Sequence, residues 1–566
     1  MITLAYFLKQ TTLKGRTYLA IYESFYSAEK KGTAHRSYKS LGSIETLTKN
    51  GMLDPVNFYQ KEVDALNAAK KEEGIKKISH VSPLLYLGYF PLKSILEKMK
   101  IKKYVDLFQL TNAFEFDLYE VMSTLIYARS VHPCSKLKTF HDVLPQLYTK
   151  PNYSYHQLLH ALAFMGNNYE KFVELFTAQT ASIYKMDTSK TYFDCTNFYF
   201  EIDREDDFKK NGPSKENQKA PIVGLGLLLD AHQIPIGMKM YPGNQSEKPV
   251  LRQVISQLKA QNNISGKTIH VADKGLNCAD NIATATLNGD GYLFSKSVKQ
   301  LPKTEKVWVL LPQDYTEIYD ANGKHLYSAK SCIDEFAYTI TTADGKRKQV
   351  LLKEKRLVTF NPKLAKKKQY EIQKMIEKAK RLSHSQAKKK EYGEASKYVN
   401  FQGNDGEKSH VVLNEDAIKK DLELAGYNML VTSETLMSDQ DMYDTYHNLW
   451  RIEESFRIMK SDLDARPVFL QNTDSIQGHF LLCYLTVLLE RILQFKVLDN
   501  QYPASQLFKF FKNFRVVKAE NKYINTTTSN PCIEGLTQFS QLPLTNYFLS
   551  KTQIKSILNF KVNILP

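Results

Sequence analysis

The sequence at residues 191–200 is Thr191-Tyr192-Phe193-Asp194-Cys195-Thr196-Asn197-Phe198-Tyr199-Phe200. Its aromatic and β-branched residues predict a strong, largely buried β-strand. Asp194 lies inside this strand, and an isolated carboxylate near a core costs several kcal/mol unless it is paired or holds a metal ion. We therefore expect Asp194 to have a chemical role.

Two more acidic residues have similar apolar surroundings. Asp273 closes the strand-like run His270-Val271-Ala272, and Glu453 follows Trp450-Arg451-Ile452 on an apparent helix. Three carboxylates from separate elements can hold two Mg²⁺ ions about 4 Å apart, with Mn²⁺ able to replace them, which is the ligand pattern of two-metal phosphoryl transfer. Asp194, Asp273 and Glu453 are thus the predicted catalytic and metal-binding residues.

Seven predicted elements surround the first two acids. They are strands at 191–200, 222–229 and 234–241, a helix at 247–261 with Ser246 as its N-cap, a strand at 268–272, a helix at 279–287 and a strand at 291–295. This order is the one expected of a ribonuclease H-like α/β domain. A strand at 426–432 and helical residues at 476–498 continue the pattern after a long interruption.

The composition changes along the chain and predicts five regions. Residues 1–80 form a small β-rich unit with a strand at 18–25 and a turn at 30–33, and residues 81–187 form a helical domain for DNA binding or for packing and dimerisation. The catalytic core takes residues 188–299 and 426–500, interrupted by a β-rich and basic helical insertion at 300–425, and 501–566 is a C-terminal tail. The insertion carries two hairpin signals, Asn322-Gly323 and Asp344-Gly345.

Basic residues dominate the charge of the chain. The formal net charge is +17 and the pI is about 9.2, which favours a polyanionic partner such as nucleic acid over a membrane surface. Between residues 363 and 397, twelve Lys or Arg stand against four Glu. Such a run is either a solvated helix face or a surface for DNA phosphates, and the global charge favours DNA.

Cysteine usage and hydropathy indicate a cytoplasmic protein without a membrane anchor. The six cysteines are scattered without a Cys-x-x-Cys pair, which argues against a zinc site and against a disulfide scaffold. The first residues do not resemble a signal peptide, and the longest apolar stretch, at 480–489, is too short to cross a bilayer.

The third acid lies on a helix predicted to run from its N-cap Ser438 to about Leu463. On a regular α-helix Tyr446, Glu453 and Lys460, which are spaced by seven, lie close to one face. A phenol, a carboxylate and an ammonium on one face of a helix indicate that this face has a function and is not only solvated.

Together these motifs resemble the bacterial insertion-sequence DDE transposases, whose third acid lies on a helix with a Tyr, Arg, Glu, Lys signature after an inserted β domain. The resemblance covers residues 190–490 and includes Phe193-Asp194-Cys195-Thr196, Pro242-Gly243-Asn244, Ala272-Asp273-Lys274-Gly275-Leu276, the run from Tyr446 to Lys460, and Arg466-Pro467-Val468. Leu449 departs from the signature, because the family has arginine three residues after the tyrosine. Arg451 or Arg457 is then expected to supply that charge.

The resemblance implies an enzyme that binds double-stranded DNA, as a homodimer, at the terminal inverted repeats of its own insertion sequence. It would hydrolyse a phosphodiester at each element end and join the freed 3′-hydroxyls to target DNA. Tyr446, Lys460 and one of the two arginines would contact DNA phosphates. Lys215, in a polar loop between two core strands, is a further candidate DNA contact.

Two other functions fit the same residues. A ribonuclease H-like nuclease would share the three acids without strand transfer, and a catalytically dead descendant of a transposase would only bind DNA. Three intact acids argue against the dead protein, since a binding module does not need them. Inverted repeats flanking the gene would favour the transposase over the nuclease.

Overall fold

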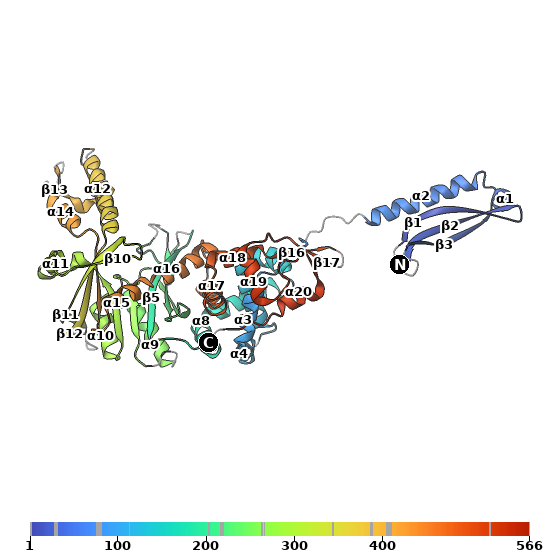
Figure 1. Ribbon diagram of the computed structural model, residues 1–566. Helices are drawn as coiled ribbons and strands as arrows, with labels where there is room; N and C mark the ends of the chain where they lie inside the picture. Colours follow the sequence, from blue (N-terminus) through green and yellow to red (C-terminus); the bar gives the residue numbers. More distant parts are fainter. Residues whose placement is uncertain are drawn as a thin grey trace. The chain divides into compact units, whose positions relative to one another are not determined.

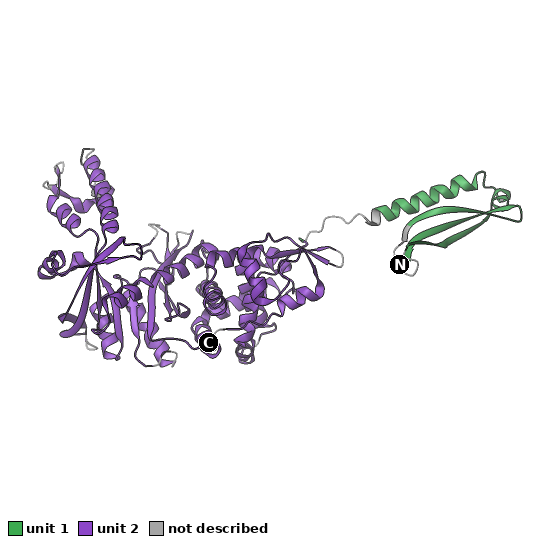
Figure 2. Ribbon diagram, in the orientation of Figure 1, with its two compact units in different colours: residues 1–82 green, residues 83–566 purple. Residues whose placement is uncertain are grey.

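The computed structural model describes residues 3–27, 32–74, 82–112, 114–201, 204–215, 220–261, 264, 266–341, 345–384, 389–402, 410–519 and 522–564. The chain forms two compact units, Met1–Ser82 and Pro83–Pro566, which Figure 2 shows in different colours. Each unit has its own sheet and its own buried residues.

The first unit is a three-stranded antiparallel sheet with one long helix. β1 (Thr3–Leu13), β2 (Arg16–Ser27) and β3 (Gly32–Ser43) pair in sequence order and are followed by α1 (Ile44–Lys49) and α2 (Pro55–Gly74). The side chain of Asn67 on α2 accepts the backbone N–H of Tyr6 at 2.8 Å and donates to its carbonyl at 2.9 Å, which attaches the helix to β1. The predicted strand at 18–25 lies within β2, whereas Lys30 and Lys31 of the predicted turn fall outside the described residues.

One nine-stranded mixed sheet runs through the second unit in the order β10-β11-β12-β15-β9-β8-β5-β6-β7 (Figure 1). Five strands match the predicted core, namely β5 (Lys190–Tyr199), β6 (Ile222–Leu229), β7 (Pro235–Pro242), β8 (Ile269–Ala272) and β9 (Gly291–Lys296). β5, β6 and β7 form an antiparallel meander, while β8 runs parallel to both β5 and β9. All of β6 is buried, which requires cover on both faces of the sheet.

Different helices cover the two faces of these strands. Side chains of α9 (Lys248–Ala260) and α10 (Ala279–Leu287) share one core cluster with Phe193 and Leu228. Side chains of α17 (Thr473–Ile492) share the other cluster with Tyr192 and Leu227, the sequence neighbours of that first pair. This alternation is the two-residue period of a strand buried on both sides.

The strands of the predicted insertion continue the same sheet, and the second unit is a mixed α/β structure. After the 3₁₀ turn Val298–Gln300 and α11 (Lys303–Leu310), β10 (Thr316–Tyr319), β11 (His325–Thr341) and β12 (Arg347–Phe360) extend the sheet beyond β15 (Tyr427–Thr432). β15 pairs with both β12 and β9. The described part of the second predicted hairpin turn, Gly345, lies between β11 and β12 as expected.

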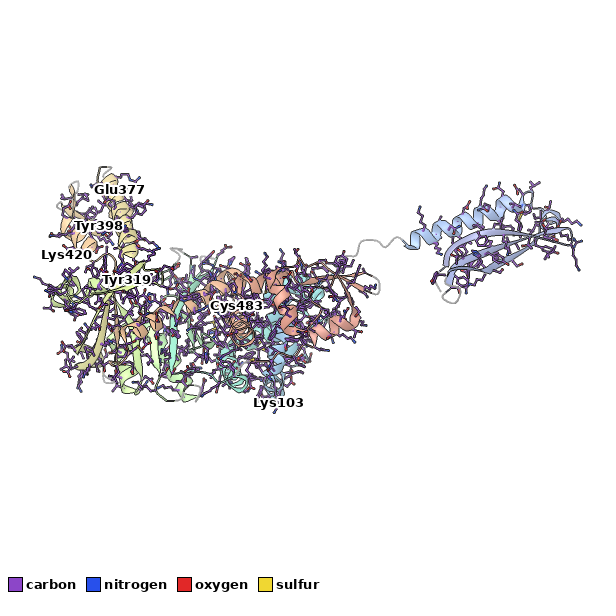
Figure 3. All side chains as sticks on the ribbon, in the orientation of Figure 1. Lys103, Tyr319, Glu377, Tyr398, Lys420 and Cys483 are labelled. Atoms are coloured by element: carbon purple, nitrogen blue, oxygen red, sulfur yellow. The ribbon has the colours of Figure 1, made fainter. Side chains whose placement is uncertain are left out.

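Between β12 and β15 the chain leaves the sheet as a small helical subdomain. Its elements are α12 (Pro362–His384), α13 (Lys389–Tyr392), the 3₁₀ helix Gly393–Tyr398, β13 (Val399–Gln402), β14 (His410–Leu413) and α14 (Glu415–Glu423). Ile372, Ile376, Tyr398 and Ile418 form a core of their own. Glu377 and Lys420 are exposed on this subdomain, where Figure 3 labels them with Tyr398.

The helices before β5 pack around α17, which is buried on almost every side and carries Cys483 (Figure 3). They are α3 (Phe90–Lys98), α4 (Ile101–Leu110), α5 (Leu118–Val131), the short α6 (Lys136–Lys138), the π segment Thr139–Val143, the 3₁₀ turn Leu144–Gln146, α7 (Tyr155–Asn167) and α8 (Tyr169–Ile183). α7 and α17 cross at glycines: a Cβ on Gly478 would lie 2.1 Å from the Leu162 carbonyl oxygen, and one on Gly166 would lie 1.7 Å from that of Asp474. Only glycine permits this backbone contact.

Residues after 500, which the sequence left without predicted structure, fold onto the helices. α17 continues as the π segment Leu493–Val497, followed by α18 (Ala504–Asn513), β16 (Arg515–Ala519), β17 (Lys522–Asn525), α19 (Pro531–Ser540), β18 (Phe548–Ser550) and α20 (Lys551–Leu558). β16 pairs with β4 (Leu84–Tyr86), the first strand of the unit. These elements escaped prediction because each is short and the partner of β16 lies at the other end of the unit's sequence.

A buried polar network joins the insertion to the core sheet. Glu354 of β12 accepts the hydroxyls of Tyr292 (2.6 Å) and Tyr338 (2.7 Å) on one carboxylate oxygen. Its other oxygen accepts Nε (3.1 Å) and Nη2 (3.0 Å) of Arg356, whose Nη1 donates to Glu305 of α11 at 2.6 Å. Since Tyr292 lies on β9 and Tyr338 on β11, the network connects strands that do not pair with each other.

Glu354→Gln should therefore destabilise the second unit. The amide cannot balance the charge of Arg356, and breaking a buried ion pair costs about 3–5 kcal/mol. Glu335→Gln, on the exposed part of β11, is the matched control and should change stability by less than about 0.5 kcal/mol. Denaturant unfolding measures both variants, and equal midpoints would show that the network does not hold the insertion in place.

Candidate active site

Asp194 and Asp273 follow the same pair of residues on two neighbouring strands. Phe193 of β5 is paired with Ala272 of the parallel strand β8, and each acid comes directly after one member of this pair. Oδ1 of Asp194 accepts the backbone N–H of Cys195 at 2.7 Å, and Oδ1 of Asp273 accepts that of Gly275 at 2.8 Å. Parallel pairing thus places the two acids on neighbouring positions in the middle of the sheet, where β8 ends and β5 continues.

The Asp194 carboxylate is only partly compensated by its surroundings. Burial raises the pKa of Asp194 to about 7, against the opposing charge of Lys215, and the neighbouring Asp273 carboxylate adds to the rise. The Nζ atom of Lys215 lies 3.8 Å from Oδ1 of Asp194. A buried acid with a raised pKa beside a second acid is typical of a functional site.

The third acid lies on α16 (Trp450–Arg457), and the prediction of one unbroken helix from Ser438 to Leu463 is wrong. α15 (Asp439–His447) does begin after the predicted cap Ser438. The backbone then tightens, with Leu449 N–H bonded to the Tyr446 carbonyl at 3.0 Å, and after α16 it widens into a π segment, Ile458–Asp462. A tight turn and a wide turn interrupt the regular period on which the seven-residue spacing relied.

Tyr446, at the end of α15, is influenced electrostatically by all three acids. Its side chain is half-buried and hydrogen-bonded to Ser295 of β9. Burial raises the pKa of Tyr446, and the charges of Asp273, Glu453 and Asp194 raise it further. The phenol therefore lies within electrostatic reach of all three predicted acids, which come from β5, the end of β8 and α16.

The donor chemistry of the three acids fits a divalent cation, although they form no closed cage. Carboxylate oxygens are the ligands that Mg²⁺ prefers. Within the part of the chain that the structure describes, no three carboxylate, imidazole or thiolate side chains are gathered closely enough to hold a metal ion. Glu453 is exposed, so packing does not fix its carboxylate.

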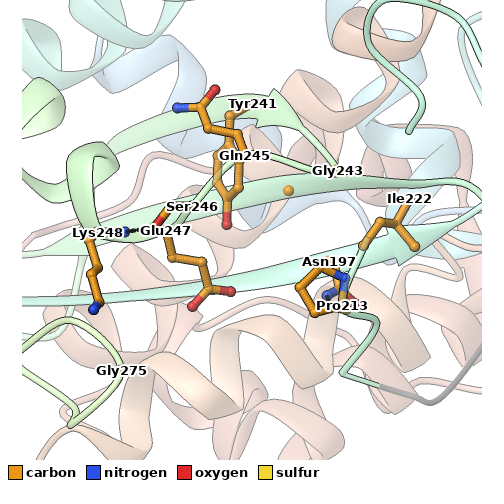
Figure 4. A pocket seen from close by; sticks show the side chains of 11 residues that line it. Asn197, Pro213, Ile222, Tyr241, Gly243, Gln245, Ser246, Glu247, Lys248 and Gly275 are labelled. Carbon is orange, nitrogen blue, oxygen red and sulfur yellow. Dashed lines mark hydrogen bonds between the residues drawn. The ribbon is translucent and has the colours of Figure 1, made fainter. Parts of the chain in front are cut away.

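A fourth acid, Glu247, was missed by the sequence analysis. Lys215 bridges it to Asp194, because Nζ lies 3.3 Å from Oε1 of Glu247 and also donates to the Cys195 carbonyl. Glu247 extends into a cavity of about 250 Å³ that Asn197 also lines (Figure 4). The predicted cap of α9 was off by one residue: Glu247, not Ser246, is the N-cap residue, and its side chain makes no capping bond.

Lys460 lies on the π segment after α16 and near the same acids. Its Nζ is 5.5 Å from the centroid of the Phe198 ring, which is on the strand that carries Asp194. Burial and the nearby charge of Lys215 lower the pKa of Lys460 to about 8, and the Asp194 carboxylate opposes this shift. Lys215 and Lys460 are thus two lysines whose charges act on Asp194 and on each other.

Arg451 and Arg457 both contact Glu454, the neighbour of the predicted catalytic acid. Oε2 of Glu454 lies 3.6 Å from Nη1 of Arg451 and 3.1 Å from Nη2 of the buried Arg491, and Oε1 lies 3.4 Å from Nη2 of Arg457. Leu449, at the position of the signature arginine, is buried in the main core, where a charged side chain would lose its hydration.

The second unit is thus a mixed α/β structure with two acidic residues side by side on its central strands. Residues 188–489, more than half of the chain, match the family described as Transposase DDE domain. The chain belongs to this family and is a transposase, a class of enzyme that acts on DNA. No curated protein matches the sequence. None of the helices that the structure describes is long and apolar enough to cross a membrane.

Asp194→Asn should raise the thermal midpoint of the metal-free protein at pH 8 by about 1–4 °C. The folded pKa of about 7 exceeds the unfolded value of about 3.9, so the folded state binds the proton more tightly and the wild type loses stability as the pH rises from about 4 to 7. The uncharged amide avoids this loss. Its advantage should be absent below about pH 4 and complete above about pH 7.

Asp187→Asn is the matched control just before β5. A hydrogen bond from Ser189 lowers the pKa of Asp187, so removal of this charge should lower the thermal midpoint at pH 8. Mg²⁺ should stabilise the wild type and the Asp187 variant but not Asp194→Asn. If Asp194→Asn melts below the wild type in metal-free buffer at pH 8, the Asp194 charge is well compensated and the interpretation fails.

Proposed function

We propose that the protein binds the terminal inverted repeats of its own insertion sequence, cleaves the phosphodiester at each element end and joins the 3′-hydroxyls to target DNA. It would act on double-stranded DNA as a homodimer in the cytoplasm. The observation that carries the proposal is the adjacency of Asp194 and Asp273 on the parallel strands β5 and β8, inside the region that matches the transposase family.

The strand order supports a ribonuclease H-like core. In the order β7-β6-β5-β8-β9, the strands β5, β6 and β7 form an antiparallel meander. β8 pairs in parallel with β5, and β9 pairs in parallel with β8. α9 connects β7 to β8, and α10 connects β8 to β9. The chain leaves this core after β9 and returns with β15 and the acid-bearing helix. Residues 300–425 are then an insertion that separates the third acid from the other two in sequence.

Both reactions are displacements at phosphorus. In the first, a water oxygen attacks and the 3′-oxygen leaves; in the second, that 3′-oxygen attacks a target phosphodiester and another 3′-oxygen leaves. Two Mg²⁺ or Mn²⁺ ions held by Asp194, Asp273 and Glu453 would supply Lewis acidity at the attacking and leaving oxygens. The chain's own residues must then bind the strand and balance the charge of its phosphates.

Lys460, Lys215 and Tyr446 are the groups suited to positioning the strand. The two ammonium groups lie near Asp194, and their charge complements the phosphates that flank the scissile bond. The phenol of Tyr446 can donate to a phosphate oxygen because burial and the acids keep it protonated. Arg457 is the better placed of the two arginines, since 58% of its side chain is exposed against 20% for Arg451.

The lysines of α12 form a second surface for DNA. Ala365, Ile372, Ile376 and Ala379 bury one stripe of this helix, and the lysines between them are mostly exposed. They contact the DNA backbone without reading its sequence, because an ammonium on a flexible stem recognises charge rather than base edges.

Glu453→Gln should abolish cleavage of a duplex that carries the element end, in the presence of Mg²⁺, without loss of DNA binding or of thermal stability. The adjacent variant Glu454→Gln should keep cleavage but lower the thermal midpoint, because it removes the anion shared by Arg451, Arg457 and Arg491. Single-turnover cleavage and thermal melting of both variants test this. Cleavage by Glu453→Gln within about tenfold of the wild-type rate would remove Glu453 from the catalytic set.

Replacing Lys363, Lys366, Lys367 and Lys378 by Gln should weaken binding to specific and random duplexes alike. The slope of log affinity against log salt should fall by about one for each lost phosphate contact. The control removes the same charge elsewhere, at the exposed lysines 98, 100, 551 and 555 on or beside α3 and α20. If both quadruple variants change the slope equally, α12 contributes only its share of the net charge.

A further inference from the structure

Three basic side chains are buried together on the helical side of the second unit. Arg129 is near the end of α5, Lys136 is in α6, and His479 is in α17; their residues are 6%, 6% and 5% exposed. None of them belongs to the acid site described above. Burying cations in a group is unfavourable unless something compensates their charge.

The contacts within the group leave both cations without an anion. Nδ1 of His479 lies 3.2 Å from Nζ of Lys136 and 3.4 Å from Nη2 of Arg129, and Nε2 lies 3.1 Å from the Ala465 carbonyl. Nε2–H therefore donates to that carbonyl and Nδ1 accepts from the cations, which requires a neutral ring. Burial and the two cations indeed lower the pKa of His479 well below its usual value.

No carboxylate in the described part of the chain lies within ion-pair distance of Arg129 or Lys136. Arg129 instead donates from Nη1 to the Leu463 carbonyl at 3.2 Å. Burial and the charge of Arg129 lower the pKa of Lys136 well below its usual value. A lysine has three N–H donors and an arginine has five, so both side chains keep donors for a ligand.

These groups line a cavity of about 620 Å³ that is open to solvent. Lys138 adds a third cation at its mouth, and the exposed Asp464 is its acidic lining residue. Phe469, which is 70% exposed, lies on the same wall. The cavity thus combines buried and exposed cations with an apolar ring.

We propose that this cavity binds a phosphodiester group of the DNA strand held at the active site. The proposal rests on the proposed function. Leu463, Asp464 and Ala465, which contact the basic group or line the cavity, follow directly on the π segment that carries Lys460. Arg466 then lies over Tyr199, at the end of the strand that carries Asp194. The cavity wall thus continues the segment that carries Lys460, and Phe469 offers a surface for a sugar or a base of the bound strand.

Lys136→Met separates a binding role from a structural one, because the two roles predict opposite stability changes. The methionine keeps the apolar stem and removes an uncompensated buried charge, so the thermal midpoint should stay or rise while phosphate binding is lost. Lys330→Met is the matched control. That buried lysine donates to the carbonyls of Trp308 (2.6 Å) and Leu311 (2.7 Å), so its loss should lower the midpoint and leave phosphate binding intact.

The probes are inorganic phosphate, read by thermal shift, and a random-sequence duplex without divalent metal, read by affinity at several salt concentrations. Phosphate should stabilise the wild type and Lys330→Met but not Lys136→Met. For Lys136→Met the duplex affinity should fall several-fold, and its salt slope should fall by about one. If Lys136→Met does not fold, the exposed Lys138→Gln replaces it, with the same expected loss in slope.

A phosphate shift that survives in Lys136→Met would overturn the site. A lost phosphate shift with an unchanged duplex affinity and slope would show that the cavity takes a free anion, and would overturn the assignment to DNA. Because both probes work without divalent metal, these failures leave the cleavage test on Glu453 untouched, and a failure of that test leaves this one standing.

Discussion

The parallel pairing of β5 with β8 is the constraint on which the site depends. The match of Phe193 with Ala272 places Asp194, inside β5, beside Asp273, which follows the end of β8, and so brings together two acids that are far apart in sequence. A shift of this register by one residue would turn Asp194 toward the opposite face of the sheet. Two apolar clusters, one on each face, prevent such a shift, because each accepts only alternate residues of β5.

The shifted pKa values near Asp194 and Asp273 follow from the burial of this part of the sheet. A half-buried carboxylate beside another carboxylate binds its proton more tightly. The Glu247 carboxylate adds to this effect on Asp194, and the charge of Lys215 only partly relieves it. Lys460 feels the reverse effect, since a buried ammonium near a second ammonium loses its proton more readily. Acids and lysines thus face each other with their charges incompletely balanced, which is the arrangement expected where a phosphate and cations are to be bound.

Sequence reasoning located the core strands within about two residues, because long apolar runs with clear turns leave few alternatives. It failed where the backbone departs from a regular period. No residue between Tyr446 and Leu463 signals that one turn tightens and a later one widens, so the predicted unbroken helix was wrong. Glu247 was overlooked for another reason: an acid at a helix start is ordinary, and only the fold brings it to Lys215.

The pairing of β4 with β16 makes the two ends of the second unit interdependent. Beyond that strand pair, Lys93 donates to the Leu558 carbonyl at 3.0 Å, and the backbone N–H of Val562 donates to Ser94 at 2.8 Å. A ribosome must therefore complete almost the whole polypeptide before β4 and α3 have all of their partners. Chains truncated before β16 would leave one edge of β4 open and part of the α3 surface uncovered, so such fragments should aggregate.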